Sequence, residues 1–292
     1  MDIKNLSLFD LHCDTPLKIY LGEEPTVCTE EITKFTKYTG CFAVWVRDDD
    51  PAPYNTARQM FNSFLNKNTL PIIKTAEDFC GKTSVVLTLE GGAATLGSTE
   101  ILEEFFALGV RALTLTWNGE NMLASGSDAT GGLKPRGEEI IKKANELSMA
   151  LDLSHINRRG FYDAMQSAEK IYVSHTACFD VFPHRRNITV QMAKEVAERG
   201  GIVGICFYPP FLGAGNVFEN IYRHISLFLY EGLCDSIALG SDFDGADCDK
   251  KLAGPSHTAD LYSFLLGKGI DRKTLNKIFF ENAERFFRGI IK

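Results

Sequence analysis

The stretch SVVLTLEGGAATLGSTEILEEFFALGVRALTLT, residues 84–116, decides the fold that this sequence predicts. It opens with a run of β-branched and apolar residues over 84–89, which is typical of a buried strand. An amphipathic stretch over 100–109 follows, with apolar residues three and four positions apart, and it ends in glycine as helices commonly do. A second strand-like run covers 110–116. Strand, helix and strand in this order indicate an alternating α/β fold.

The same alternation continues along the whole chain. Strand-like runs lie at 6–11, 41–46, 84–89, 110–116, 149–153, 170–174, 201–207 and 236–240. Helical patterns lie at 100–109, 137–148, 161–168, 189–200 and 220–232. Residues 48–80 are interpreted as a longer excursion after the second strand, and no linker-like change of composition supports two doubly wound domains. We therefore predict one (β/α)8 TIM barrel domain over 1–292, with any active site at the C-terminal ends of its strands.

Composition excludes several classes of protein. The chain has 292 residues, with 45% hydrophobic and 24% charged residues, which is ordinary for a globular protein and unlike a disordered one. A net charge of −7 without basic clusters argues against nucleic acid or a membrane as partner, and no apolar run is long enough to cross a bilayer. The N-terminus does not read as a secretory signal, so we expect a cytoplasmic protein with reduced, mostly buried cysteines.

Metal-ligand residue types stand where the predicted strands end. These are His12, Asp14, Glu90, His155, His175 and Asp242. The C-terminal strand ends of a barrel meet at one mouth, so we expect these side chains to converge there. Histidine and carboxylate together suit a zinc-type ion. The sequence therefore predicts a metal site.

The first strand carries two of these residues in the pattern HCD. Because side chains alternate along a strand, His12 and Asp14 are expected on one side and Cys13 on the other, where it packs. Asp10 has the same parity as His12. It is interpreted either as an outer partner that orients a ligand or as an ordinary buried polar group.

Other motifs carry no comparable signal. The segment DFDGADCDK (242–250) lacks the spacing and the closing Glu of a calcium loop, and the glycines over 91–97 lack the ending of a phosphate loop. His184, His224 and His257 are interpreted as an exposed residue, a helix-face residue and a loop residue, and none is expected to bind metal.

Seven motifs together resemble one family. They are FDLHCDTPL (9–17), LTLEGG (87–92), RALTLTWNGEN (111–121), MALDLSHIN (149–157), YVSHTACFDVFPHRRN (172–187), GGIVGICFY (200–208) and ALGSDFDG (238–245). In this order they resemble the membrane dipeptidase (renal dipeptidase) family of the amidohydrolase superfamily, and its soluble bacterial-type members in particular. The resemblance runs from residue 7 to about 288.

The resemblance implies two zinc ions and a dipeptide substrate. His12 and Asp14 would bind one ion, His155 and His175 the other, and Glu90 would bridge them. A hydroxide bridging both ions would hydrolyse the peptide bond of free dipeptides, including those with a D-residue at the second position. Asp242 would act as the catalytic acid and base. Members of the family are often homodimers.

Three further positions match substrate contacts of the family. Arg186 matches an arginine that contacts the substrate, and Tyr208 matches a tyrosine at the substrate's carboxylate end. Trp117 stands where the family usually has a histidine facing the scissile carbonyl. An indole N–H can donate a hydrogen bond but cannot carry a proton reversibly. This departure keeps open another amidohydrolase reaction, on a small amide or lactone such as an N-acyl amino acid. A barrel that has lost catalysis is disfavoured, because every metal position and Asp242 are present.

Overall fold

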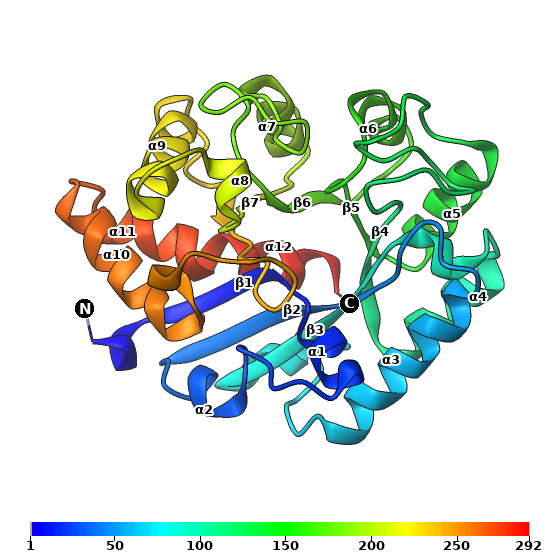
Figure 1. Ribbon diagram of the computed structural model, residues 1–292, viewed down its shortest axis with the longest axis horizontal. Helices are drawn as coiled ribbons and strands as arrows, with labels where there is room; N and C mark the ends of the chain where they lie inside the picture. Colours follow the sequence, from blue (N-terminus) through cyan, green and yellow to red (C-terminus); the bar gives the residue numbers. More distant parts are fainter. Residues whose placement is uncertain (1, 292) are drawn as a thin grey trace.

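The computed structural model describes residues 2–291, so the two ends of the predicted domain, residues 1 and 292, lie outside the described part. Eight parallel strands pair in chain order and close into a barrel (Figure 1). They are β1 (Ser7–Cys13), β2 (Lys37–Trp45), β3 (Thr83–Glu90), β4 (Val110–Thr114), β5 (Ala150–Asp152), β6 (Ile171–Thr176), β7 (Val203–Ile205) and β8 (Ile237–Leu239). The predicted barrel is confirmed.

The strand-like runs of the sequence all lie on strands, with differences at their ends. β2 begins at Lys37, earlier than the apolar run that predicts it, because its first residues pair with β1 and with β3. β7 is shorter than its run and covers only Val203–Ile205. Pairing between neighbours, and not hydrophobicity alone, therefore sets where a strand begins and ends.

Helices cover the outside of the barrel. The five predicted helices correspond to α4 (Thr99–Leu108), α5 (Pro135–Glu146), α6 (Arg158–Met165), α7 (Val190–Glu198) and α9 (Val217–Tyr230). Helices α4, α6, α7 and α9 have N-cap side chains that accept a hydrogen bond from a backbone N–H of the first turn; these N-caps are Ser98, Asn157, Thr189 and Asn216. Shorter helices α1 (Thr15–Leu21), α2 (Thr29–Ile32) and α8 (Pro209–Leu212) lie in the segments that follow β1 and β7.

The segment 48–80, interpreted from sequence as an excursion, contains the helix that connects β2 to β3. This helix, α3 (Pro53–Lys67), begins at a proline and buries Ala57, Met60, Phe61 and Phe64. Their spacing of three and four residues is a helical pattern that the sequence already carries. The prolines at the start of the segment make this pattern hard to recognise in the sequence. A proline in the first helical turn nevertheless favours a helix start.

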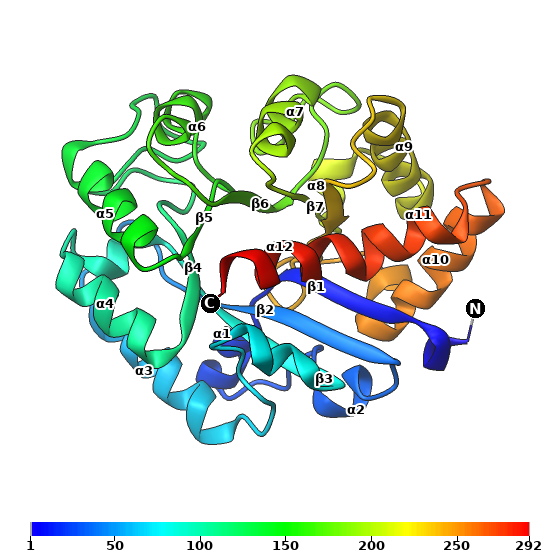
Figure 2. The same cartoon turned by 180° about the vertical axis from the view of Figure 1, so that it is seen from behind.

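Helices also follow β8, where the sequence after His257 and at the C-terminus looks helical, and the last of them closes the bottom of the barrel. They are α10 (Thr258–Gly267), α11 (Arg272–Asn276), a π-helical turn over Lys277–Glu281, and α12 (Asn282–Ile290). One apolar cluster joins side chains of the strands, such as Phe9 and Tyr172, to Phe286 and Phe287 of α12. Figure 2 shows α12 lying across this end of the barrel. Only the opposite mouth remains for a site.

An irregularity in β1 overturns the parity argument for Asp10. Between Asp10 and Cys13, β1 advances by three residues while its partner β2 advances by only two. The strand β1 therefore contains one extra residue at this point. Phe9 and Leu11 both belong to the interior cluster of the barrel. Asp10 and His12 therefore do not share a side by simple alternation. Asp10 instead accepts hydrogen bonds from the backbone N–H groups of His12 and Ser241 and from the Ser241 hydroxyl.

Within the described residues, all eight cysteines are free. Cys13, Cys41, Cys178 and Cys206 are buried, whereas Cys80 is exposed and the other three are half-buried, so the expectation of mostly buried thiols holds for half of them. Among residues 2–291, no helix combines the length and the apolar character that a bilayer-spanning segment needs.

Candidate metal centre

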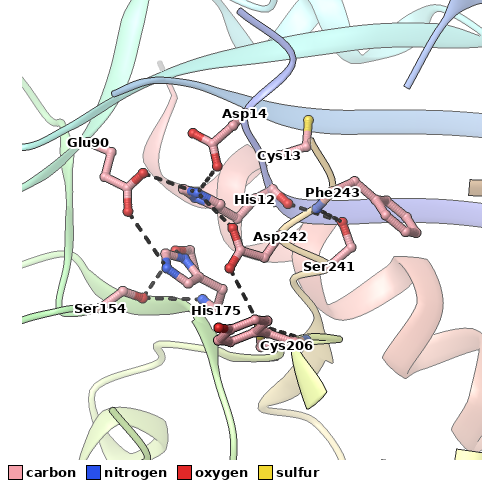
Figure 3. A network of polar contacts seen from close by, with 12 residues as sticks. His12, Cys13, Asp14, Glu90, Ser154, His175, Cys206, Ser241, Asp242 and Phe243 are labelled. Carbon is pink, nitrogen blue, oxygen red and sulfur yellow. Dashed lines mark hydrogen bonds and ion pairs between the residues drawn. The ribbon is translucent and has the colours of Figure 1, made fainter. Parts of the chain in front are cut away.

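The C-terminal mouth of the barrel brings all six predicted metal-type residues together. Figure 3 labels all of them except His155. Their ligand atoms form three overlapping triads in which every pair of atoms lies within 4.8 Å. The triads are His12–Asp14–Glu90, Glu90–His155–His175 and His12–His175–Asp242. Five of these side chains are almost fully buried, and Asp242 lies at the edge that faces the cavity.

Glu90, the last residue of β3, lies at the centre of the cluster. Its Oε2 is 3.3 Å from His12 Nε2, whereas its Oε1 is 2.8 Å from His155 Nε2 and 3.7 Å from His175 Nε2. Asp14 Oδ2 is 3.4 Å from His12 Nε2 on the first side. The two oxygens of one carboxylate therefore face two different sets of ligand atoms.

The two histidines on the second side have facing nitrogens. His155 Nε2 and His175 Nε2 are 2.7 Å apart. His155 Nδ1 lies 2.8 Å from Asn118 Oδ1, which only accepts hydrogen bonds, so His155 carries its proton on Nδ1. Its Nε2 lone pair consequently faces the Glu90 oxygen, an arrangement that is repulsive unless a cation lies between them.

The charge states in the cluster follow from burial and from its carboxylates. Burial opposes a charge on His12, but Glu90 and Asp14 outweigh it and hold the pKa of His12 well above its ordinary value. Burial lowers the pKa of His155 to about 4, with a further contribution from the positive charge of Arg186. Burial also holds the pKa of His175 well below the ordinary value, and the charge of His12 adds to this. His155 and His175 are therefore neutral, as metal-ligating histidines must be.

Burial and neighbouring charges also shift the pKa values of the carboxylates. Burial raises the pKa of Asp14 to about 7 and also raises the pKa of Asp242, which Glu90 raises further. Burial acts on Glu90 in the same direction, but the charge of His12 outweighs it and holds the pKa of Glu90 well below its ordinary value. Three acidic groups this close cannot all ionise easily without a compensating cation.

The donor set fits divalent metal ions. Among the described residues, His12 Nε2 and Asp14 Oδ1 are buried and have no hydrogen-bond partner, which is costly for a polar atom in the interior. Both residues belong to the triad His12–Asp14–Glu90. Imidazole nitrogen and carboxylate oxygen are the ligand types that zinc and similar ions prefer. A divalent ion held by this triad would satisfy both atoms.

Two site residues adopt backbone conformations that side chains rarely take. His155 follows β5 and Asp242 follows β8, and each has a φ of 65°. Left-handed geometry at a non-glycine residue costs about 1–3 kcal/mol and is common at functional sites. The residue before Asp242 is fixed, because the Ser241 N–H and hydroxyl both donate to Asp10. Gly240 allows this turn, since a Cβ there would lie 1.7 Å from the Ser174 carbonyl oxygen.

A cavity of about 500 Å³ opens over the cluster. Its lining includes the acidic residues Asp14, Glu90, Asp242 and Asp247 and the basic residues His184, Arg185 and Arg186. Arg186 is 6% exposed, and its Nε has no partner among the residues that the structure describes. Burial lowers the pKa of Arg186, but a guanidinium remains charged at any ordinary pH. The guanidinium donates from Nη2 to the His175 carbonyl oxygen, and its free Nε–H is suited to binding an anion.

The three predicted substrate contacts all line this cavity. Arg186 and Tyr208 lie beside Phe211, and Trp117 lies next to His155 with ring centroids 6.2 Å apart. Trp117 also packs edge-on against Trp45, with centroids 5.2 Å apart. The cavity is therefore partly walled by indole rings.

Sequence reasoning missed the residues that hold the loop after β4. Asp48 accepts hydrogen bonds from the backbone N–H groups of Trp117 and Gly119 and from the Asn121 amide. The same loop carries Asn118, which orients His155. Asp48 lies in the run DDDPAP. Nothing in that run indicates that one of its three aspartates forms hydrogen bonds with another loop.

The remaining histidines lie outside the metal cluster. His184, interpreted as exposed, is half-buried and lines the cavity. His224 lies on α9, as expected, where it accepts from the Cys178 N–H and contacts the Leu212 carbonyl oxygen. His257 ends a short 3-10 turn at Pro255–His257.

Comparison with known proteins identifies the family. Residues 54–291 match the model of a family described as membrane dipeptidase, peptidase family M19. The chain belongs to this family. It is a hydrolase of the metallo-dipeptidase type with a His/Glu metal-binding cluster, so the predicted family and enzyme class are confirmed.

Several known proteins resemble this chain in sequence. A protein of Klebsiella pneumoniae, described as an uncharacterized protein in the pqqA 5′ region, is 31% identical over 222 residues, which cover 71% of this chain and 82% of that protein. An uncharacterized dipeptidase of Schizosaccharomyces pombe is 32% identical over 215 residues, covering 70% of this chain. The match covers 53% of the yeast protein, so this chain spans about half its length.

Solved structures share the fold of this M19 member. A metallopeptidase from Rhodobacter sphaeroides, liganded with a phosphinate mimic of the dipeptide L-Ala-D-Ala, superposes with a TM-score of 0.88 at 22% identity. That match covers 98% of this chain and 99% of the other. The probable dipeptidase PvdM from Pseudomonas aeruginosa superposes with a TM-score of 0.84 at 16% identity, covering 98% of this chain and 95% of PvdM.

Proposed function

We propose that this protein is a two-metal dipeptidase that hydrolyses the peptide bond of free dipeptides, including those with a D-residue at the second position. The observation that carries the proposal is Glu90, whose two oxygens face two different sets of ligand atoms. His12 and Asp14 would hold one zinc ion, and His155 and His175 would hold the other. Glu90 would contact both.

Asp242 is the proposed catalytic acid and base. When bound, the two ions lower the pKa of water and polarise the scissile carbonyl. Asp242 accepts a proton from the attacking water and returns it to the leaving amine. Its raised pKa, caused first by burial, suits a group that must hold a proton between these two steps. Asp242 Oδ1 lies 3.9 Å from His12 Nε2, at the edge where the cluster meets the cavity.

Arg186 and Tyr208 are proposed to hold the substrate's carboxylate. The buried Arg186 has an unpartnered Nε, so a carboxylate would form charge-assisted hydrogen bonds there. The acidic residues that line the cavity complement the ammonium group at the other end of a dipeptide. The L-Ala-D-Ala mimic bound by the Rhodobacter sphaeroides metallopeptidase supports both the substrate class and the D-residue.

A second candidate function has one specific observation in its favour. Trp45 and Trp117 form an apolar part of the cavity wall, and Trp117 replaces the usual family histidine. Such a surface could cover the acyl chain of an N-acyl amino acid or the ring of a lactone. The same metal centre would serve either reaction.

A substrate panel on zinc-loaded protein tests the proposal. The panel contains L-Ala-L-Ala, L-Ala-D-Ala, the amide of L-Ala-D-Ala, N-acetyl-alanine and a small lactone. We expect efficient cleavage of the two free dipeptides only. Faster hydrolysis of N-acetyl-alanine or the lactone would instead establish the second candidate.

The variant Arg186→Met adds a test of carboxylate recognition. It is expected to lower kcat/KM for L-Ala-D-Ala about 10- to 100-fold, the usual worth of a charged hydrogen bond, and to affect the amide far less. Arg185→Met is the matched control, because Arg185 is exposed and pairs with Asp128 at 3.0 Å. Equal losses on free and amidated substrate would remove Arg186 from carboxylate binding.

A further inference from the structure

One histidine of the cluster is connected to a buried carboxylate through a hydroxyl group. His175 Nδ1 lies 2.7 Å from the Oγ of its neighbour Ser174, and Ser174 Oγ lies 2.5 Å from Asp152 Oδ2. All three residues are buried, with at most 2% of each exposed. Asp152 ends β5 and the other two lie on β6, so the connection crosses from one strand to the next.

The direction of each hydrogen bond can be assigned by counting donors. The Asp152 carboxylate also accepts from the Ser174 N–H at 2.9 Å, the Ser154 N–H at 3.0 Å and the Thr114 hydroxyl at 3.1 Å. With the Ser174 hydroxyl as fourth donor, each carboxylate oxygen accepts two hydrogen bonds. The Ser174 proton is therefore directed to Asp152, because a hydrogen bond to a carboxylate is the strongest one open to it.

This assignment determines the proton position on His175. A serine hydroxyl has one donor and two acceptor positions. Ser154 Oγ lies 3.1 Å from Ser174 Oγ and can donate to it, which leaves one acceptor position for His175. His175 therefore donates from Nδ1, and its Nε2 keeps the lone pair that faces His155 Nε2 and Glu90 Oε1.

We propose that Asp152 and Ser174 are positioning residues that hold His175 in the Nδ1–H tautomer and so present Nε2 to a metal ion. This inference rests on the metal centre of the proposed function and adds two residues to it. Outer partners of this kind orient metal-ligating histidines in many proteins and are worth about 10- to 100-fold in metal affinity.

The Ser174 hydroxyl contacts the His175 ring, whereas other hydrogen bonds hold the backbone of β6. The Ser174 N–H is bound to Asp152 independently of the side chain, and the His175 N–H donates to Ser154 Oγ. The Ser174 carbonyl oxygen lies against Gly204 and Gly240, where a Cβ would come within 1.9 Å and 1.7 Å. Ser174→Ala should therefore leave the backbone of β6 in place.

The barrel contains a matched control at the junction of β8 with β1. Ser241 donates its N–H and its hydroxyl to Asp10, as Ser174 does to Asp152, and it also directly precedes a site residue. Its Oγ accepts from the Phe243 N–H, and no imidazole nitrogen is among its hydrogen-bond partners in the described structure. Ser241→Ala thus removes the same hydroxyl–carboxylate bond without changing the environment of a histidine ring.

The tautomer can be read directly by NMR. In metal-free protein with ¹⁵N-labelled histidine, protonated and unprotonated ring nitrogens have well-separated shifts, and His175→Gln assigns the signal. We expect the Nδ1–H form of His175 in the wild type and in Ser241→Ala, and a substantial Nε2–H population in Ser174→Ala. A wild-type His175 protonated on Nε2 would overturn the proposal without any variant, and so would a Ser174→Ala spectrum equal to the wild type.

Metal affinity gives a second readout on the same variants. In chelator competition with zinc, Ser174→Ala should bind one of two ions about 10- to 100-fold more weakly, and Ser174→Thr, which keeps the hydroxyl, should restore binding. Equal weakening in Ser174→Ala and Ser241→Ala would show a general structural effect and contradict the proposal. Neither readout uses a substrate, so failure of the dipeptidase proposal in the substrate panel would remain a separate result.

Discussion

Asp242→Asn is expected to reduce turnover of L-Ala-D-Ala by about 10²–10⁴-fold, the range for a lost general acid and base. Asparagine has nearly the same shape but cannot accept the proton of the attacking water. It also tolerates the positive φ of 65° at this position, so the turn after β8 should persist. The variant should also retain zinc. Steady-state kinetics, thermal unfolding and metal analysis of the purified variant check the three expectations together.

Asp244→Asn is the matched control for this variant. Asp244 has a φ of 68° in the same turn, but its carboxylate binds Thr15 and the backbone N–H groups of Thr26 and Val27. Its replacement should lower the melting temperature and retain most of the turnover. Near-normal turnover of Asp242→Asn with zinc bound would exclude Asp242 from proton transfer.

Glu90→Gln is expected to lose metal. A glutamine amide has one oxygen and one nitrogen, and the nitrogen has no lone pair to offer an ion. One of the two sets of ligand atoms would therefore lose a ligand, and the whole centre would lose a negative charge. We expect the weakening to exceed the roughly 10- to 100-fold effect of outer partners, because Glu90 itself would be a ligand. Equilibrium dialysis against zinc, followed by metal analysis, measures the ions retained per chain.

A distant glutamate provides the control for Glu90→Gln. Glu104 is half-buried and pairs with Arg58 at 3.0 Å and with the Tyr54 hydroxyl. Glu104→Gln removes the same charge from the chain and should bind as much zinc as the wild type. Two ions still bound at wild-type affinity in Glu90→Gln would contradict the bridging role.

The barrel could be predicted from sequence because its strands are buried on both faces. Strands of this kind appear as continuous β-branched and apolar runs, and the residues at their ends interrupt those runs visibly. Glu90 after the run 84–89 and His175 after 170–174 are such interruptions. Their convergence then follows from barrel geometry alone. The division of ligands around Glu90 did not follow from the pattern, and it was available only from the family resemblance.

Other parts of the site could not be predicted because they depend on three-dimensional pairing. The extra residue in β1 changes which side chains face the barrel interior, and this overturned the parity argument for Asp10. Asp48 reaches the loop after β4 from a different loop, a contact that no local pattern encodes. Ser174 did carry a signal, since each SH pair places a serine beside a predicted ligand, but only the hydrogen bonds show which serine contacts a ring.

The most direct test of the two-metal dipeptidase is a zinc titration of chelator-treated protein during hydrolysis of L-Ala-D-Ala. We predict no cleavage without metal, and activity that rises with added zinc and becomes maximal when two ions are bound per chain. Cleavage that survives complete metal removal would contradict it. So would a protein that holds two zinc ions and leaves every free dipeptide intact.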